Sequence, residues 1–152
     1  MSKPRQVSLR PSPEGGGLLH ASCVSVQGEA VVIIGASGSG KSAMALELMS
    51  KGADLVADDQ VIMTKNEGQL IASSPAALKG RIEARFVGLL NASAIASAVV
   101  TLWVDLDQVE DERLPPHHTI TCLGLTYPLL YRVPHPHFSA AVLQYLEHGR
   151  EA

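Results

Sequence analysis

Short apolar runs alternate with polar and glycine-bearing turns along the middle of the chain, and this pattern predicts strands more often than helices. Residues 30–34 read Ala-Val-Val-Ile-Ile, a β-branched run typical of a buried strand. Residues 18–26 alternate well enough to form another strand, and the turn at 27–29 separates the two. Strands this close in sequence pair antiparallel. We therefore expect a mixed β-sheet.

Two stretches have the pattern of helices. Residues 43–49 consist of strong helix formers, and we expect this helix to end near Lys51, because Gly52 is a natural left-handed stop. A second helix is expected over residues 138–148, with its apolar positions on one face. The remaining apolar runs predict strands at residues 55–57, 61–64, 70–72, 99–105, 119–123 and 127–133, with a strand-like or turn-edge stretch at 81–87.

Proline and glycine indicate where regular structure stops. Residues 1–17 are polar and rich in both, which predicts a flexible leader before one domain at 18–148 and a short tail at 149–152. The polar, proline-bearing stretch at 107–118 predicts a loop. Pro128 removes a backbone donor and predicts an edge position for its strand.

Length and composition favour a single globular domain, and the strands and helices predicted above give it an α/β class. The 152 residues are 46% hydrophobic and 18% charged, and the net charge is −3. This balance gives no basic field for binding nucleic acid, and no apolar run is long enough to cross a membrane. Cys23 and Cys122 form no paired motif, so we expect free thiols and a cytoplasmic location.

One motif dominates the chemistry. Between the strand at 30–34 and the helix at 43–49 the chain reads G-x-x-x-x-G-K-S, which is the P-loop pattern in its strand-to-helix context. The backbone N–H groups of such a loop suit a polyphosphate, the lysine reaches the β- and γ-phosphates, and the serine hydroxyl ligates Mg²⁺. We therefore expect ATP with Mg²⁺ to bind here. The residues of the motif are Gly35, Ala36, Ser37, Gly38, Ser39, Gly40, Lys41 and Ser42.

A P-loop does not determine which group receives the phosphate. A kinase needs a carboxylate that accepts the proton of the attacking hydroxyl. Asp58 and Asp59 follow the strand at 55–57, where α/β proteins place ligand groups. Asp105 is a rival, because an apolar strand followed by aspartate is typical of a Walker B element. Spacing alone leaves these alternatives open.

Three other polar residues, each considered alone, have a simple structural interpretation that requires no catalytic role. Glu83 lies between two arginines, as in a solvated ion pair, and Arg113 lies in a charged surface stretch. His20 lies on the strand before the P-loop hairpin, and a lone strand histidine is more often structural than catalytic.

Taken together, these segments resemble the catalytic core of the bacterial HPr serine kinase/phosphorylase family. The resemblance covers nearly all of residues 18–131 and implies a P-loop kinase core similar to the phosphoenolpyruvate carboxykinase-like fold. It rests on the segments Leu19-His20-Ala21, Gly35 to Ser42, Ala45-Leu46-Glu47-Leu48, Leu55-Val56-Ala57-Asp58-Asp59, Glu83-Ala84-Arg85-Phe86-Val87-Gly88 and Glu112-Arg113-Leu114.

The resemblance implies a role for each matching residue. Asp59 would be the general base that accepts the proton of the acceptor serine, with His20 assisting it. Lys41 would hold the triphosphate. The Mg²⁺ ligands would be Ser42 and Glu83, and Arg113 would counter charge at the transferred phosphoryl group. Asp105 receives no role.

The family also implies the partner and the assembly. The expected function is an ATP- and Mg-dependent protein serine kinase acting on the phosphocarrier HPr of the phosphotransferase system, assembled as a hexamer. The alternatives are a small-molecule kinase or NTPase, and a nucleotide-sensing module without turnover.

The chain departs from the family pattern in three places. Only a short leader precedes the core, which predicts the short form of the family. Phe86 stands where the family signature has glycine. No segment matches the C-terminal V-x-P-G-R-N loop tied to phosphoserine removal, so the resemblance supports the kinase activity and not the phosphorylase activity.

Overall fold

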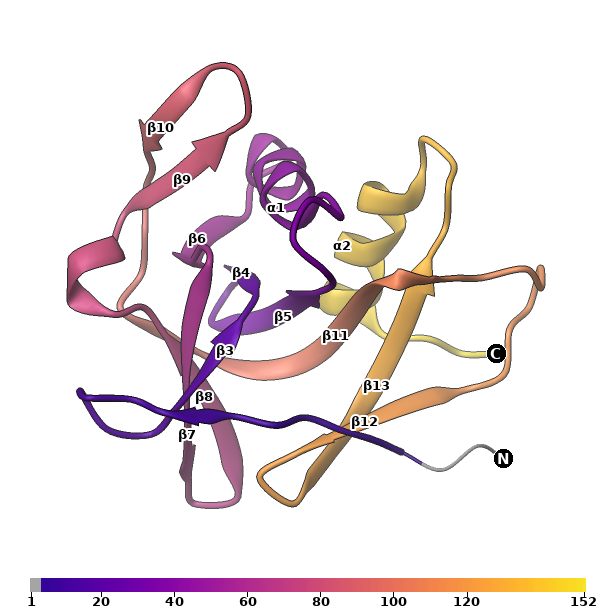
Figure 1. The fold of residues 1–152 in the computed structure, drawn as a ribbon. Coiled ribbons are helices and arrows are strands. Elements are labelled where there is room, and N and C mark those ends of the chain that lie inside the picture. The colour runs from indigo at the N-terminus through magenta and orange to yellow at the C-terminus, as the bar shows by residue number, and fades with distance from the viewer. Residues whose placement is uncertain (1–3) are drawn as a thin grey trace.

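The structure, a computed structural model, describes residues 4–152 and contains a curled mixed sheet with two helices on one face (Figure 1). The helices are α1 (Lys41–Ser50) and α2 (Phe138–His148), with a 3₁₀ turn η1 (Ala76–Leu78). The strands are β1 (Arg5–Gln6), β2 (Arg10–Pro11), β3 (Gly17–His20), β4 (Ser22–Val26), β5 (Glu29–Ile34), β6 (Asp54–Ala57), β7 (Gln60–Asn66), β8 (Gln69–Ser73), β9 (Arg81–Ala84), β10 (Gly88–Asn91), β11 (Ser97–Val109), β12 (His118–Cys122) and β13 (Leu125–Arg132).

The main sheet contains eleven of these strands in mixed orientation, as the sequence predicts. The long strand β11 lies at its centre and pairs in parallel with β5 and β13 and antiparallel with β8. On the other side of β5, strand β4 runs antiparallel and then pairs with β6. Strands β9 and β10 form a separate hairpin, which projects beside α1 at the upper left of Figure 1.

Apolar residues alternate along the central strands and supply two cores. In β5, Val31 and Ile33 pack toward α1 and α2, whereas Val32 and Ile34 face the interior of the curled sheet. Trp103 of β11 is fully buried in that second core. The alternation therefore places the helices on one face of the sheet and folds the other face around a core of its own.

Both cysteines are buried free thiols. Burial raises the pKa of the Cys23 thiol and raises that of Cys122 to about 11, because the charged thiolate loses its hydration. Both side chains therefore stay protonated near neutral pH and act as small apolar core residues.

Several predicted elements differ from those observed. The strand expected at 18–26 is divided into β3 and β4, because the chain changes partner at Ala21: β3 pairs with β7, and β4 with β5. The loop expected at 107–118 begins later, since β11 continues to Val109. The expected edge position of Pro128 is wrong: β13 lies between β12 and β11, and the pairing with β11 begins one residue later, at Leu129.

The segment expected to be a flexible leader contains two short strands. Strand β1 pairs in parallel with β12, and β2 pairs antiparallel with β3. The Arg5 side chain donates to the carboxylate of Asp105, which is completely buried. The segment thus supplies a cation to a charge in the interior. The domain limits of 18–148 remain a prediction.

Loss of the Arg5 side chain is expected to destabilise the fold. The variant Arg5→Ala leaves the buried Asp105 carboxylate without its cation, and we expect the free energy of unfolding to fall by about 1–3 kcal/mol in urea denaturation. Arg10→Ala is the matched control, because Arg10 is exposed on β2 and its loss should change stability by less than about 0.5 kcal/mol. Equal stabilities for the two variants would contradict a structural role for Arg5.

Candidate active site

The candidate site forms where the ends of several strands meet at one edge of the sheet. Strand β4 is antiparallel to both β5 and β6, so the carboxyl ends of β5 and β6 lie at the same edge as the start of β4. The segment 35–42 follows β5 at this edge and is called the glycine loop below. Asp58 and Asp59 follow β6, so the topology brings the two motifs together.

The glycine loop is built around backbone conformations that favour glycine. Gly38 and Gly40 have φ values of +83° and +102°, and Gly40 caps the start of α1. Lys41 is buried, and its Nζ donates to the carbonyl oxygens of Gly35 and Ala36 at 2.9 and 3.0 Å. An ammonium group and the free N–H groups of a helix start are thus combined in one turn, an arrangement suited to binding an anion.

Asp58 is the fixed carboxylate of the site. It is 6% exposed, and its Oδ1 accepts hydrogen bonds from the hydroxyls of Ser22 at 2.8 Å and Ser42 at 2.7 Å. Its Oδ2 accepts from the backbone N–H of Glu83 at 3.2 Å. One side chain therefore joins β4, the first turn of α1 and the β9 strand.

Asp59 points out of the fold next to a histidine. Its backbone is left-handed, with φ of +69°, and its side chain is 65% exposed. His20 ends β3, which pairs with β7 so that His20 lies opposite Gln60. The Nε2 atom of His20 is 3.2 Å from Asp59 Oδ1.

Asp59, His20 and the glycine loop line a cavity of about 510 Å³. Its lining comes from β3, β4, the glycine loop, the start of α1, the turn after β6 and the β9–β10 hairpin. It includes most of the residues predicted for the site: His20, Ser37, Gly38, Gly40, Lys41, Ser42, Asp59 and Glu83. The structure thus brings together a cation, carboxylates and hydroxyl donors around a space large enough for a small-molecule ligand.

Comparison with known proteins identifies the family of this chain. The family model described as "HPr Serine kinase C-terminal domain" matches residues 16–113. The chain belongs to this family. The resemblance found in the sequence is thereby confirmed.

Individual relatives carry related names. HPr kinase/phosphorylase of Clostridium tetani is 44% identical over 77 residues, which are 51% of this chain and 25% of that protein. The protein of the same name from Listeria monocytogenes serotype 4a is 43% identical over 81 residues, 53% of this chain and 26% of the relative. The matched segment thus spans about a quarter of the length of these relatives.

A solved structure shares the fold. The structure titled "Structure of the Hpr(Ser) kinase/phosphatase from Coxiella burnetii" aligns over 86% of this chain and 88% of that one, with a TM-score of 0.72 and 22% sequence identity. The predicted α/β class with a mixed sheet and helices, similar to the HPr kinase fold, is therefore confirmed.

Phe86, which stands where the family signature has glycine, has a backbone conformation that favours glycine. It lies at the tip of the β9–β10 hairpin with φ of +68°, a conformation that glycine adopts at lower cost. Its side chain is fully exposed. The neighbouring Arg85 and Val87 line the cavity, so the hairpin tip borders the candidate site.

Two candidate residues lie elsewhere. Arg113 is exposed and lines a different hollow, together with Glu110 and Glu112. Asp105, the rival to Asp58 and Asp59, is buried against Arg5 and does not line the cavity.

Ser42, by contrast, lines the cavity, and its hydroxyl donates a hydrogen bond to the Asp58 carboxylate.

Sequence reasoning missed two residues of the site. Asp107 accepts hydrogen bonds from the N–H of Ala36 at 2.9 and 3.1 Å and so anchors the glycine loop to β11. Ser22 is completely buried beneath Asp58. Asp107 closely follows the predicted central strand, which was a usable signal, whereas nothing in the sequence distinguishes Ser22 from other strand serines.

Ser22→Ala is expected to weaken the fold at the site. The change removes a buried donor from the Asp58 carboxylate, and we expect a loss of about 1–3 kcal/mol in the free energy of unfolding, measured in urea. Ser25→Ala is the control, because Ser25 is equally buried on the same strand and makes no side-chain hydrogen bond within residues 4–152. A loss at Ser25 as large as that at Ser22 would show that burial, and not the bond to Asp58, causes the effect.

Proposed function

We propose that this chain is an ATP- and Mg-dependent protein serine kinase that phosphorylates an HPr-type phosphocarrier protein. The observation that carries the proposal is the shared cavity, which Asp59 and His20 line together with Lys41 and other residues of the glycine loop. The family membership and the names of the relatives support HPr as the acceptor. With both cysteines as free thiols, we propose the cytoplasm as its location.

The triphosphate would lie along the glycine loop. Lys41 and the loop amides bind the phosphate oxygens in this arrangement, and the positive end of α1 favours their charge. The site also fits Mg²⁺, because the hydroxyl of Ser42 and the carboxylate of Glu83 are oxygen donors on the same cavity, and Asp58 lies 2.7 Å from that hydroxyl. When bound, the ion supplies neutralisation of the phosphate charge.

Asp59 is the general base in this proposal. The acceptor serine would enter the cavity from solvent, and its Oγ would form a bond to the γ-phosphorus as the bond from that phosphorus to the β-phosphate oxygen breaks. The hydroxyl proton passes to the Asp59 carboxylate, and ADP leaves. His20, 3.2 Å away, orients that carboxylate. Catalysis then rests mainly on positioning and charge.

Two implied features stay outside this scheme. Arg113 receives no role, because it does not line the cavity. The hexamer that the resemblance implies also stays a prediction. We restrict the proposal to the kinase direction, because residues 131–136 do not match the loop tied to phosphoserine removal.

Incubation with Mg-ATP and purified HPr tests the function directly. We expect acid-stable phosphoserine on HPr. Hydrolysis of ATP without labelled HPr would support a small-molecule kinase or NTPase, and nucleotide binding without turnover would support a sensing module; either result would contradict the proposal.

Gly35→Ala is expected to weaken polyphosphate binding. A Cβ at this position would lie 2.5 Å from Ser39 Oγ, 3.2 Å from Ser39 Cβ and 3.3 Å from Leu106 Cβ, so the Ser39 side chain and its surroundings in the glycine loop must shift. Gly28→Ala is the matched control, because Gly28 also has a positive φ, +81°, but a Cβ there meets nothing within 4 Å. Calorimetric titration with Mg-tripolyphosphate should show at least about a tenfold loss for Gly35→Ala and unchanged affinity for Gly28→Ala. Equal affinities would exclude the loop as the phosphate site.

Asp59→Asn separates binding from transfer. The amide keeps the shape of the side chain but cannot accept the serine proton, so we expect Mg-ATP affinity to persist while the rate of HPr labelling falls by about 10²–10⁴. Asp54→Asn, at the exposed start of β6, the strand that precedes Asp59, should leave both unchanged. Normal labelling by Asp59→Asn would refute its assignment as the base.

A further inference from the structure

A line of polar contacts runs from the N-terminal strand β1 to the glycine loop. The Arg5 side chain donates to one carboxylate oxygen of Asp105, and the backbone N–H of Asp107 donates to the other, at 2.9 Å. The Asp107 carboxylate in turn accepts from the N–H of Ala36 through both of its oxygens. Consecutive hydrogen bonds therefore connect β1 to the loop proposed to bind phosphate.

The pairing of β5 with β11 places these groups together. The two strands run parallel up to Ile34 and its partner Asp105, and the chain enters the glycine loop at the next residue of β5. Strand β11 continues past this point to Val109. Asp107 thus reaches Ala36 with its side chain where the backbone ladder between the two strands has ended.

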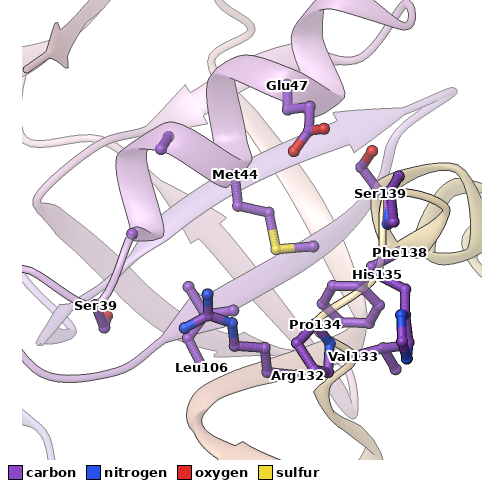
Figure 2. A pocket seen from close by; sticks show the side chains of 13 residues that line it. Ser39, Met44, Glu47, Leu106, Arg132, Val133, Pro134, His135, Phe138 and Ser139 are labelled. Carbon is purple, nitrogen blue, oxygen red and sulfur yellow. The ribbon is translucent and has the colours of Figure 1, made fainter.

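The same part of β11 also passes close to the loop with its apolar side. Leu106, between the two aspartates, lines a second cavity of about 490 Å³ together with Ser39 of the glycine loop (Figure 2). This cavity lies between the start of α1, β11 and the loop that leads from β13 to α2. A Cβ added at Gly35 would come within 3.3 Å of Leu106 Cβ. A shift of β11 at this point would therefore be felt in the glycine loop.

Ala36 is the loop residue that the contact with Asp107 holds. Its carbonyl oxygen accepts from the backbone N–H of Ser39 and from Lys41 Nζ, both at 3.0 Å. Because Asp107 binds the N–H of the same residue, Ala36 is held at both of its backbone groups. The position of Ala36 thus affects the ammonium group and the backbone amides that suit the loop to phosphate.

Arg5 acts on this contact from a distant part of the sheet. In the strand order, β12 and β13 separate β1 from β11, yet the sheet curls so that the Arg5 side chain reaches the completely buried Asp105. An unpaired charge in the interior is unfavourable, so without Arg5 the Asp105 carboxylate would turn toward other donors or water. Its remaining bond, from the N–H of Asp107, would change with it.

We propose that Asp107 is a positioning residue for phosphate binding, and that Arg5 holds Asp107 in place through Asp105. This inference rests on the proposed function, because it takes the phosphates to lie on the glycine loop. Strand β1, outside the segment 16–113 that matches the family, thereby sets how tightly the loop binds phosphate.

Calorimetric titration of the full chain with Mg-tripolyphosphate tests the role of Asp107, which is exposed and should tolerate substitution. We expect Asp107→Ala to weaken binding by about five- to tenfold, because the N–H of Ala36 loses its acceptor. Asp107→Asn keeps an oxygen that can accept this bond, so its affinity should stay within about twofold of the wild type. The proposal fails if Asp107→Ala binds no more weakly than Asp107→Asn. It also fails if both variants bind more tightly than the wild type, because the Asp107 charge would then act by repelling phosphate.

A double-mutant cycle tests the link to Arg5. Arg5→Ala should weaken tripolyphosphate binding by about two- to fivefold in the wild type and by less than about 1.5-fold in the Asp107→Ala background, because its effect passes through Asp107. Arg5→Gln keeps a donor without the charge and should give the same pattern with a smaller loss, so it replaces Arg5→Ala if that variant does not fold. Additive losses in the double variant, or no loss on changing Arg5, would overturn the link.

Two controls separate this inference from the function on which it rests. Arg10→Ala, which removes an exposed arginine on the neighbouring strand β2, should leave the affinity unchanged, whereas Lys41→Ala should lose tripolyphosphate. Wild-type binding that is lost in Lys41→Ala but unaffected by Asp107→Ala would overturn this inference alone. Absence of tripolyphosphate binding by the wild type would overturn the proposed function and this inference together.

Discussion

The arrangement of the site depends on one buried carboxylate. Taking an ionised group out of water costs several kcal/mol unless it is hydrogen-bonded, and Asp58 meets this condition with two serine hydroxyls and one backbone N–H. Each donor comes from a different element, so the bonds fix β4, α1 and β9 relative to one another. The first turn of α1 is thereby held against the turn that carries Asp59.

This constraint also explains why two adjacent aspartates differ. Asp58 is used inside the fold, and the chain then turns through a left-handed residue, which directs Asp59 outward. That conformation costs a non-glycine residue about 1–2 kcal/mol, although aspartate tolerates it better than most. Backbone strain is often retained at functional positions. The left-handed conformation of Asp59, close to the glycine loop, therefore supports the proposal that Asp59, and not Asp58, is the general base.

The local elements of this fold could be predicted from the sequence, and their partners largely could not. The strand, loop and helix around Lys41 were predicted correctly, because β-branched residues, glycines and helix formers determine the local conformation of the backbone through a few sequence neighbours. The division of residues 18–26 was missed, since it is caused by a change of strand partner at Ala21. The role of Arg5 was missed for the same reason, because its partner Asp105 is a hundred residues away. The edge position predicted from Pro128 was wrong, because proline lacks a backbone N–H donor only at its own position. Strand β13 loses no hydrogen bond to β11, since its pairing with β11 begins one residue later, at Leu129.

The site shows the same division between local and distant information. Lys41, Ser42 and Asp59 belong to short motifs whose chemistry can be inferred directly from the sequence, and all three line one cavity. Arg113 was carried over from a short motif as well, yet it lies in a different hollow, so the likeness of three residues did not fix their place in space. The residues that line the site at this edge of the sheet come from segments far apart in the chain. The glycine loop has one cavity facing the β9 hairpin and another facing the loop before α2. The chemistry of a motif residue can therefore be inferred from its neighbours in sequence, whereas its place in the site depends on strand pairing across the whole chain.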